Sequence, residues 1–384
     1  MLIFDWHLDL AWNALEWDRD LTLPVHEIRR RERARSLSGP GRGTGTVSFP
    51  ALQQGNIGVV SATLLARHDA AGTMMPGCLP KSGYDSAEAA TASAKGQLAY
   101  YQAVQSRGVA RIITNWPTLV AHVEEWHARL NNFRGNGHSL SNGHAPPIGL
   151  IISMEGADPI LTPDDLFEWW EAGLRIVSLS HYGKSRYSHG TGTAGPLLQS
   201  APALLQAMEQ AGMILDVTHL ADEAMDEVFD VYGGILLASH HNCRRLVDNQ
   251  RQLRDRDVLK ISRRGGVIGI ALDNWMLDPG CSNTGGSVRR VATLETVVDH
   301  IDHVCQLTGS AECVALGSDL DGGYGTEESP ADLETVADLA KIPLILRRRG
   351  YCESEITGIM HANWMRLLER AWTSSMTRNS NSPK

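Results

Sequence analysis

The sequence predicts an α/β fold, a closed (β/α)8 barrel of the TIM type in which eight parallel strands alternate with helices. Short runs rich in Val, Ile and Leu recur along the chain, and a longer amphipathic stretch follows most of them. Strands that are apolar throughout are typical of a parallel sheet buried on both faces. The length of 384 residues suits a barrel of about 250 residues that carries insertions.

Eight of these runs have the length and composition of barrel strands, and residues 110–114 form a ninth, weaker candidate. Seven amphipathic segments are expected to be helices, and the clearest helix start is Thr162, which precedes Pro163 and two acids. The predicted strands are Leu2–Trp6, Ile57–Leu65, Ile148–Met154, Leu174–Ser180, Met213–Val217, Ile235–Ser239, Val267–Leu272 and Cys313–Gly317. The predicted helices are Ala87–Arg107, Pro117–Leu130, Pro163–Ala172, Ala201–Gln210, Ala221–Val231, Leu294–Leu307 and Pro330–Arg349.

Three stretches fall outside this alternation of strands and helices. Residues 19–45 are rich in Arg, Gly and Pro and form an excursion after the first strand, while residues 131–147 form a polar loop. Residues 373–384 are expected to be a disordered tail because they are polar and lack an apolar pattern. The remaining chain, residues 1–372, is expected to form one barrel domain.

Composition and charge exclude several classes of function. The net charge of −9 leaves no basic footprint for nucleic acid or an anionic membrane surface. No apolar stretch approaches the ~20 residues of a membrane helix, and no basic residue precedes Arg19 as a secretory signal would require. The six cysteines form no CxxC pair, which suits a reducing cytoplasm. We therefore expect a cytoplasmic enzyme or small-molecule binder.

Polar residues with metal-binding or acid–base chemistry stand at the carboxyl ends of six predicted strands. In a parallel barrel these ends open on one face, where active sites are assembled. The first two share one side of their strand because they are two residues apart. The residues, in chain order, are His7, Asp9, Glu155, His181, His219, His240 and Asp319.

Imidazoles and carboxylates without cysteine suit zinc or a similar divalent ion. Two such ions, bridged by a carboxylate and a hydroxide, are a common arrangement for hydrolysis. The residues alone therefore predict a two-metal hydrolase. A single histidine is more often a core or surface residue, so four others receive no role, and Asp321 is interpreted as a turn residue. The four histidines are His138, His144, His189 and His361.

A longer sequence motif resembles the signature of a known hydrolase family. The run ILLASHHNCRRLVDNQRQLRD, followed by ISRRGGVIGIAL, resembles the Ser-His-x-Asn-x-Arg and RGG signature of the membrane (renal-type) dipeptidase family of zinc metallopeptidases. The HxD, EG, LSH, DVTH and GSDLDG motifs follow the family's order along the chain. The resemblance covers residues 1–370 and is densest over 152–322. It implies a metal-dependent barrel of the amidohydrolase kind that hydrolyses dipeptides with a free C-terminal carboxylate.

The resemblance also implies a ligand set for two zinc ions per chain. His7 and Asp9 would hold one ion, His219 and His240 the other, and Glu155 would bridge them. Two cations ~3.5–4 Å apart need such an anionic bridge to offset their repulsion. The same ligands accept cobalt or manganese.

Three further residues receive roles in catalysis and substrate binding from the resemblance. Asp319 would draw a proton from the metal-bridging water and deliver it to the leaving amine, and His181 would donate to the developing oxyanion. Arg244, expected one helical turn beyond His240, would bind the substrate's carboxylate as a bidentate fork. The neighbouring Arg245 is assigned to the surface, and His241 is expected to flank the site.

Two departures from the family's pattern leave the substrate open. Asp273 stands where the family usually has an aromatic residue, and His361-Ala362-Asn363 replaces Gly-Gly-Asn. An acid near the carboxylate end would repel a dipeptide unless it meets a substrate amine. A related amidohydrolase acting on an N-acyl amino acid or a lactam is therefore the alternative function, and a non-catalytic, metal-stabilised binding protein is the second alternative. The resemblance also points to a homodimer.

Overall fold

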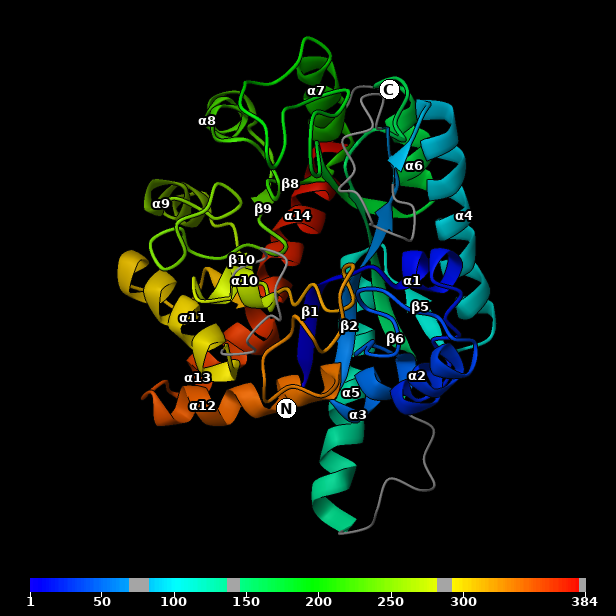
Figure 1. Cartoon of the computed structure of the whole chain (residues 1–384). Coiled ribbons are helices and arrows are strands. Elements are labelled where there is room, and N and C mark those ends of the chain that lie inside the picture. The colour runs from blue at the N-terminus through cyan, green and yellow to red at the C-terminus, as the bar shows by residue number, and fades with distance from the viewer. Residues whose placement is uncertain (69–82, 137–145, 282–291, 380–384) are drawn as a thin grey trace.

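The computed structural model describes residues 1–68, 83–136, 146–281 and 292–379. Eight parallel strands form a ring with helices around it (Figure 1). Six are paired in sequence order, and Ala238 bridges to Ile268 to join the last two. The ring closes where the Asp319 amide donates to the His7 carbonyl, at 3.2 Å. The strands are β1 (Ile3–Leu8), β2 (Ile57–Leu65), β6 (Ile148–Glu155), β7 (Leu174–Ser178), β8 (Ile214–Asp216), β9 (Leu236–Leu237), β10 (Ile268–Ile270) and β11 (Val314–Leu316).

The predicted barrel is therefore confirmed, with one distortion at β6. The weaker ninth candidate is a real strand, β5 (Ala110–Ile112), which pairs with the first half of β6. The second half of β6 pairs with β7, starting from Ile152 and Leu174. Two further short strands, β3 (Arg67–His68) and β4 (Gly83–Tyr84), pair with each other in a separate two-stranded sheet.

The predicted helices are found, with shifted ends. The segment 330–349 starts its helical part only at Val336, because Thr335 forms a capping box with Asp338 there. The helices are α4 (Ala87–Ser106), α5 (Trp116–Asn136), α6 (Asp165–Glu171), α7 (Ala201–Ala211), α8 (Asp222–Val231), α11 (Leu294–Thr308), the 3-10 helix η1 (Val336–Lys341) and α12 (Ile342–Arg348).

Other helices lie where the sequence suggested none. Most of them are short or follow a strand within a few residues, so their apolar periodicity is brief. They are α1 (Leu10–Glu16), α2 (Val25–Ala34), α3 (Phe49–Gln54), α9 (Asp255–Arg263), α10 (Asn274–Leu277), α13 (Glu353–Thr357), the π-helix η2 (Gly358–Ala362) and α14 (Asn363–Asn379).

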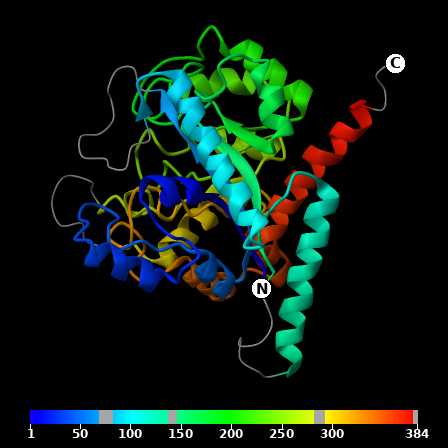
Figure 2. The same ribbon diagram turned by 90° about the vertical axis from the view of Figure 1, so that its right-hand side faces the viewer.

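Two predicted irregular segments need correction at their ends. The polar loop expected over 131–147 starts later, because α5 continues through Asn136, and residues 137–145 lie outside the described residues. The tail expected to be disordered from residue 373 is helical through Asn379, because no Pro or Gly interrupts α14 before Pro383. Residues 380–384 lie outside the described residues. α14 packs beside α5 (Figure 2).

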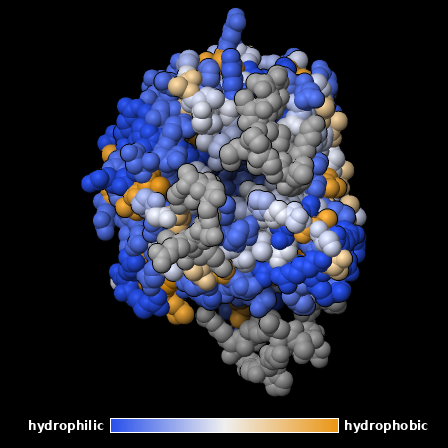
Figure 3. Space-filling model, in the orientation of Figure 1, coloured by the Kyte–Doolittle hydropathy of each residue, from blue (hydrophilic) through white to orange (hydrophobic). Residues whose placement is uncertain are grey.

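The surface of the described residues carries few large hydrophobic side chains, and these are spread over several elements. On the face in Figure 3, hydrophobic residues lie scattered among hydrophilic ones. Within the described part of the chain, no helix combines the length and apolar character needed to cross a membrane.

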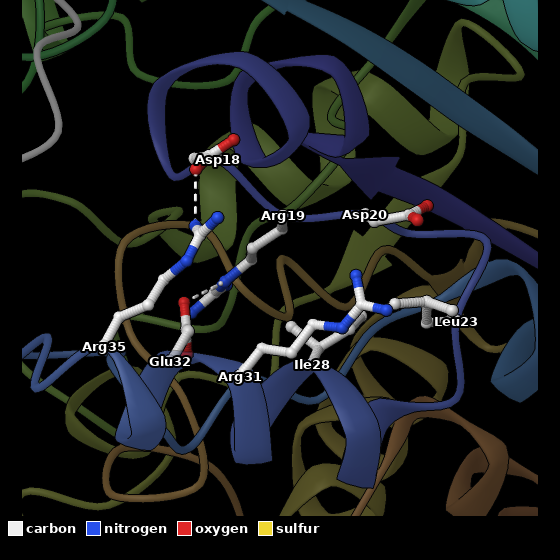
Figure 4. A pocket seen from close by; sticks show the side chains of 8 residues that line it. All are labelled: Asp18, Arg19, Asp20, Leu23, Ile28, Arg31, Glu32 and Arg35. Carbon is white, nitrogen blue, oxygen red and sulfur yellow. Dashed lines mark hydrogen bonds and ion pairs between the residues drawn. The ribbon is translucent and has the colours of Figure 1, made fainter.

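The excursion 19–45 is fastened to the barrel through a buried ion-pair network. Arg19 pairs with Glu32 at 2.9 Å and with Asp321 at 3.4 Å. Asp321 also accepts hydrogen bonds from the backbone amides of Thr46 and Val47. Asp321, which was expected to be only a turn residue, therefore connects the excursion to the loop that carries Asp319. Figure 4 shows the Arg19–Glu32 pair beside a cavity of about 200 Å³ on α2.

We expect Asp321→Ala to destabilise the protein by roughly 3 kcal/mol or more, because it leaves a buried guanidinium with one carboxylate instead of two. Chemical unfolding followed by circular dichroism measures the change. Arg35→Ala is the matched control: Arg35 lines the same cavity, but its pair with Asp18 is exposed (58% and 80%), so the stability should change little. Equal stabilities of the Asp321 variant and wild type would show that the network does not hold the excursion.

Candidate metal centre

The strand-end residues converge around one carboxylate, that of Glu155 at the end of β6. Its Oε2 lies 3.6 Å from His7 Nε2. Its Oε1 lies 3.1 Å from His219 Nε2 and 3.4 Å from His240 Nε2. The two oxygens of one carboxylate therefore face two different groups of ligand atoms, as a bridging ligand requires.

The other predicted residues complete these two groups. His7 Nε2 lies 3.9 Å from Asp9 Oδ1 and 3.8 Å from Asp319 Oδ1. On the other side, His181 Nε2 lies 3.8 Å from Glu155 Oε1. Asp319 reaches across the centre, because its Oδ2 is 4.0 Å from His240 Nε2. All seven strand-end residues predicted from the sequence thus lie at one mouth of the barrel.

The histidines of the second group are aimed by hydroxyl groups behind them. The Thr191 hydroxyl is 2.9 Å from His219 Nδ1, and the Ser239 hydroxyl is 2.9 Å from His240 Nδ1. These contacts turn both Nε2 atoms towards each other, 3.1 Å apart. A hydrogen-bond partner on the far ring nitrogen is the usual way in which metal-binding imidazoles are oriented.

The charges at the centre match what a cation needs. Burial opposes the charge on Glu155, but the nearby imidazoles of His181 and His7 hold its pKa well below the usual value. Burial, together with the charges of Arg251, lowers the pKa of His219 and His240 well below the usual value, so both are neutral. Metal ions bind the anionic carboxylate and the neutral imidazole.

The first group is more strongly charged. Burial disfavours the protonated form of His7, but Glu155, Asp9 and Asp319 outweigh it and raise its pKa to about 10. Burial and the charge of Glu155 raise the pKa of Asp9 well above its usual value. This imbalance of buried acids around one histidine is what a bound cation would relieve.

The residues present therefore fit a pair of divalent ions. His7 Nε2 and Asp9 Oδ1 are buried without a hydrogen-bond partner in the described structure, although such atoms are normally satisfied. Both belong to compact groups of potential ligand atoms within 4.8 Å of one another. Oxygen and imidazole-nitrogen donors without thiolate suit zinc and similar ions.

Two residues at the centre have strained backbones. His219 and Asp319 adopt positive φ angles of 67° and 58°, a region that non-glycine residues rarely occupy. Each lies three residues after the end of a barrel strand and belongs to a group of potential ligand atoms at the mouth.

Arg244, the residue predicted to bind the substrate's carboxylate, is engaged by other groups in this structure. Its guanidinium makes two hydrogen bonds to the Asp222 carboxylate, at 2.7 and 2.8 Å, and further ones to the Gln252 and Gln250 carbonyls. The prediction assumed a helical turn after His240, but residues 241–254 form a loop. Arg244 therefore fastens this loop to α8.

The residue that the sequence reasoning missed is Arg251. The loop returns it to the centre, where Nη2 donates to the His240 carbonyl at 3.0 Å and lies 3.2 Å from His219 Nε2. Its side chain is buried, 2% exposed, and Nη1 has no partner among the described residues. The sequence shows Arg251 only as one arginine in a run of polar residues. The hydrogen bond from the Leu253 amide to the Asn242 carbonyl folds the loop back on itself, and this fold brings Arg251 to the centre. His241, by contrast, lies outside the ligand groups, as expected.

A parallel barrel with buried imidazole and carboxylate donors at its mouth is an arrangement typical of metal-dependent hydrolases. An amidohydrolase from Pseudomonas aeruginosa shares the fold, with a TM-score of 0.63 at 15% identity over 85% of this chain and 92% of that chain. Residues 1–382 match the membrane dipeptidase family (peptidase family M19). The chain belongs to this family of metallopeptidases.

Two curated relatives named as dipeptidases align with part of this chain. An uncharacterized dipeptidase of Schizosaccharomyces pombe is 26% identical over 225 residues, which are 57% of this chain and 52% of the relative. Dipeptidase 3 of Rattus norvegicus is 25% identical over 58% of this chain and 45% of its own. This chain therefore aligns with about half the length of these two relatives.

A solved structure covers nearly the whole chain. The metallopeptidase from Rhodobacter sphaeroides, liganded with a phosphinate mimic of the dipeptide L-Ala-D-Ala, has a TM-score of 0.73 at 22% identity over 97% of this chain and 99% of that chain. This likeness confirms the fold.

Proposed function

We propose that the protein is a dinuclear metallodipeptidase that cleaves dipeptides with a free C-terminal carboxylate. The observation that carries this proposal is the Glu155 carboxylate, whose two oxygens face His7 on one side and His219 and His240 on the other. Membership of the membrane dipeptidase family supports the reaction class. Hydrolysis of a dipeptide by metal-loaded protein, measured as release of free amino acids, tests it.

The proposed ligands are those that the resemblance implied. His7 and Asp9 would hold one ion, His219 and His240 the other, and Glu155 would bridge both. When bound, the ions would activate a water molecule and polarise the scissile carbonyl. Zinc is the proposed metal because the donors are imidazole and carboxylate, and cobalt or manganese are the alternatives.

Asp319 is proposed to move the proton. Burial and the charge of Glu155 raise its pKa to about 7, although His7 opposes this shift. A carboxyl group with a pKa near neutrality can accept a proton from the attacking water and deliver it to the leaving amine. Its side chain is also 17% exposed, more than those of the ligands, so the substrate can reach it.

His181 is proposed to stabilise the oxyanion. Burial lowers the pKa of its imidazole to about 3, although Glu155 opposes this shift, so the ring is neutral. A neutral imidazole can donate one hydrogen bond to oxygen as negative charge develops on it. Its Nε2 lies at the edge of the centre, 3.8 Å from Glu155.

Arg251 takes the role first predicted for Arg244, that of binding the substrate's carboxylate. Its Nη1 is a buried donor without a partner, beside His219 and His240. A carboxylate would satisfy this donor in a charge-assisted hydrogen bond.

Arg251→Ala should lose most of its kcat/KM for a dipeptide, roughly 30- to several-thousand-fold, because removing one partner of a buried charge pair costs ~2–5 kcal/mol. The same substitution should change the kcat/KM for the matching dipeptide amide much less, since the amide carries no charge. Arg244→Ala is the control, and we expect it to preserve the ratio of acid to amide. Equal losses on acid and amide in the Arg251 variant would show that this residue does not bind the carboxylate.

The alternative function is hydrolysis of another amide, such as an N-acyl amino acid or a lactam. The buried Asp273 favours this alternative, because an acid stands where the family usually has an aromatic residue near the substrate. Offering dipeptides, N-acyl amino acids and a β-lactam to the same metal-loaded protein separates the two. A non-catalytic binding protein is the weaker alternative, because binding needs no proton-transfer group such as Asp319. A cytoplasmic location and a homodimer stay predictions.

A further inference from the structure

Asp273 is a buried acid that the proposed reaction does not use. It follows β10 and precedes α10, and its side chain is 7% exposed. The carboxyl group makes no capping hydrogen bond to α10, and its Oδ1 is buried without a partner in the described structure. The next residue, Asn274, is fully buried, and neither of its side-chain polar atoms has a partner there. Unsatisfied buried polar atoms are rare, and a cluster of them indicates a missing ligand or water.

The surroundings of Asp273 are acidic. Burial and the charges of Glu328 and Asp319 raise its pKa well above the usual value. Glu328 is held nearby, because its carbonyl accepts a hydrogen bond from the Asn274 amide at 2.8 Å. Among the described residues, the charges that act on Asp273 and Glu328 are those of other acids: Glu328 and Asp319 on Asp273, and Glu327 on Glu328. The group therefore lacks the cation that two neighbouring acids would favour.

The place of Asp273 in the barrel connects it to the substrate. Its strand β10 lies between the strand followed by His240 and the strand followed by Asp319. Tyr182 lies beside the second ligand group, with its ring centroid 5.2 Å from that of His219. Asp273 thus follows a strand whose carboxyl end opens at the same mouth as the ligand groups.

We propose that Asp273, together with Glu328, forms an acidic subsite that selects dipeptides whose C-terminal residue has a cationic side chain, such as lysine or arginine. This inference rests on the proposed function, because Arg251 must first hold the carboxylate of that residue. The side chain of the same residue then extends along the neighbouring strand end, towards Asp273. An ammonium or guanidinium group there would satisfy Oδ1 and offset the repulsion between the acids.

The same subsite reconciles Asp273 with a dipeptide substrate. An acid beside the carboxylate is unfavourable for a neutral substrate but favourable for one that carries its own cation. Selection by a charge of opposite sign, with rejection of neutral and acidic side chains, is a common device of specificity.

The test compares Ala-Lys with Ala-norleucine, which has the same chain length without the ammonium group. We expect zinc-loaded wild type to show a kcat/KM at least ~30-fold higher for Ala-Lys, and Asp273→Asn to lose most of that ratio. Glu328→Gln, a second variant at a less buried position, should lose part of it. The same ratio in wild type and both variants would overturn the proposal.

A second source of the cation is the α-amine that every dipeptide carries. If Asp273 bound that amine, Asp273→Asn would lower the kcat/KM of Ala-Lys and Ala-norleucine equally, and this outcome would also overturn the proposal. Lys-Ala and norleucine-Ala complete the set, and we expect Asp273→Asn to leave their ratio unchanged.

Binding of a product gives a readout without turnover. By calorimetry, L-lysine should bind wild type at least ~10-fold more tightly than L-norleucine, and Asp273→Asn should remove the difference. Equal affinities in wild type would contradict the subsite. Thermal unfolding and metal content of the variant serve as controls. The melting temperature should be at least as high as in wild type, because an unpaired buried acid is removed, and the metal content should be unchanged. Failure of wild type to cleave any dipeptide would instead contradict the proposed function, while lysine binding still tests the subsite.

Discussion

Glu155→Ala is expected to reduce the bound metal from two ions per chain to one or none and to bring dipeptide hydrolysis to background. The reason is that this one carboxylate belongs to two of the three groups of potential ligand atoms among the described residues, and its two oxygens face His7 on one side and His219 and His240 on the other. Without it, the two ions would repel each other with no anion between them. Elemental analysis of the purified variant measures the metal, and amino-acid release measures the activity.

Two variants control this prediction. Glu168→Ala removes an exposed carboxylate on α6 and should keep both ions and full activity. Glu155→Gln keeps the shape and removes the charge, so it should also fail to hold two ions. Two ions per chain in the alanine variant would contradict the bridging role of Glu155.

Asp319→Asn is expected to keep the fold and the metal content but to lower kcat by about 10²- to 10⁴-fold, the usual contribution of general acid–base catalysis. An amide has nearly the same shape as the carboxyl group but cannot accept the proton at neutral pH. Elemental analysis and thermal unfolding verify that metal and fold are intact, and steady-state kinetics measures kcat. Unchanged turnover at normal metal content would assign Asp319 to a structural role.

Most of the candidate metal centre was predictable, because residues that follow the strands of a parallel barrel all lie at the same end of it. A polar residue after each apolar run, such as Glu155 after β6 or His219 after β8, must lie at the shared mouth once the strands are parallel. The same reasoning located all seven residues without knowledge of any loop. The strands themselves were predictable because they are apolar throughout.

Arg251 was not predictable because its position depends on how a loop folds. Spacing along the sequence favoured Arg244, which a helix would have placed over the centre. In the structure the loop doubles back. Arg244 therefore pairs with Asp222, and Arg251 donates to the His240 carbonyl at the candidate metal centre. Loops have no fixed periodicity from which such a reversal can be deduced.

Asp321 shows a second limit of sequence reasoning. Its position in a turn was expected, but its partner Arg19 is about 300 residues away along the chain and belongs to the excursion. Contacts of this kind follow from tertiary packing, which single-sequence patterns do not encode.

The most direct test of the account is a metal titration of the metal-free protein, with hydrolysis of Ala-Lys measured after each addition of zinc. We expect negligible activity at the start and a rise that reaches its plateau at two equivalents per chain, since catalysis needs both ligand groups. The same titration of Glu155→Ala should give no rise. Full activity at one equivalent, or equal activity without any metal, would contradict a dinuclear centre built on Glu155.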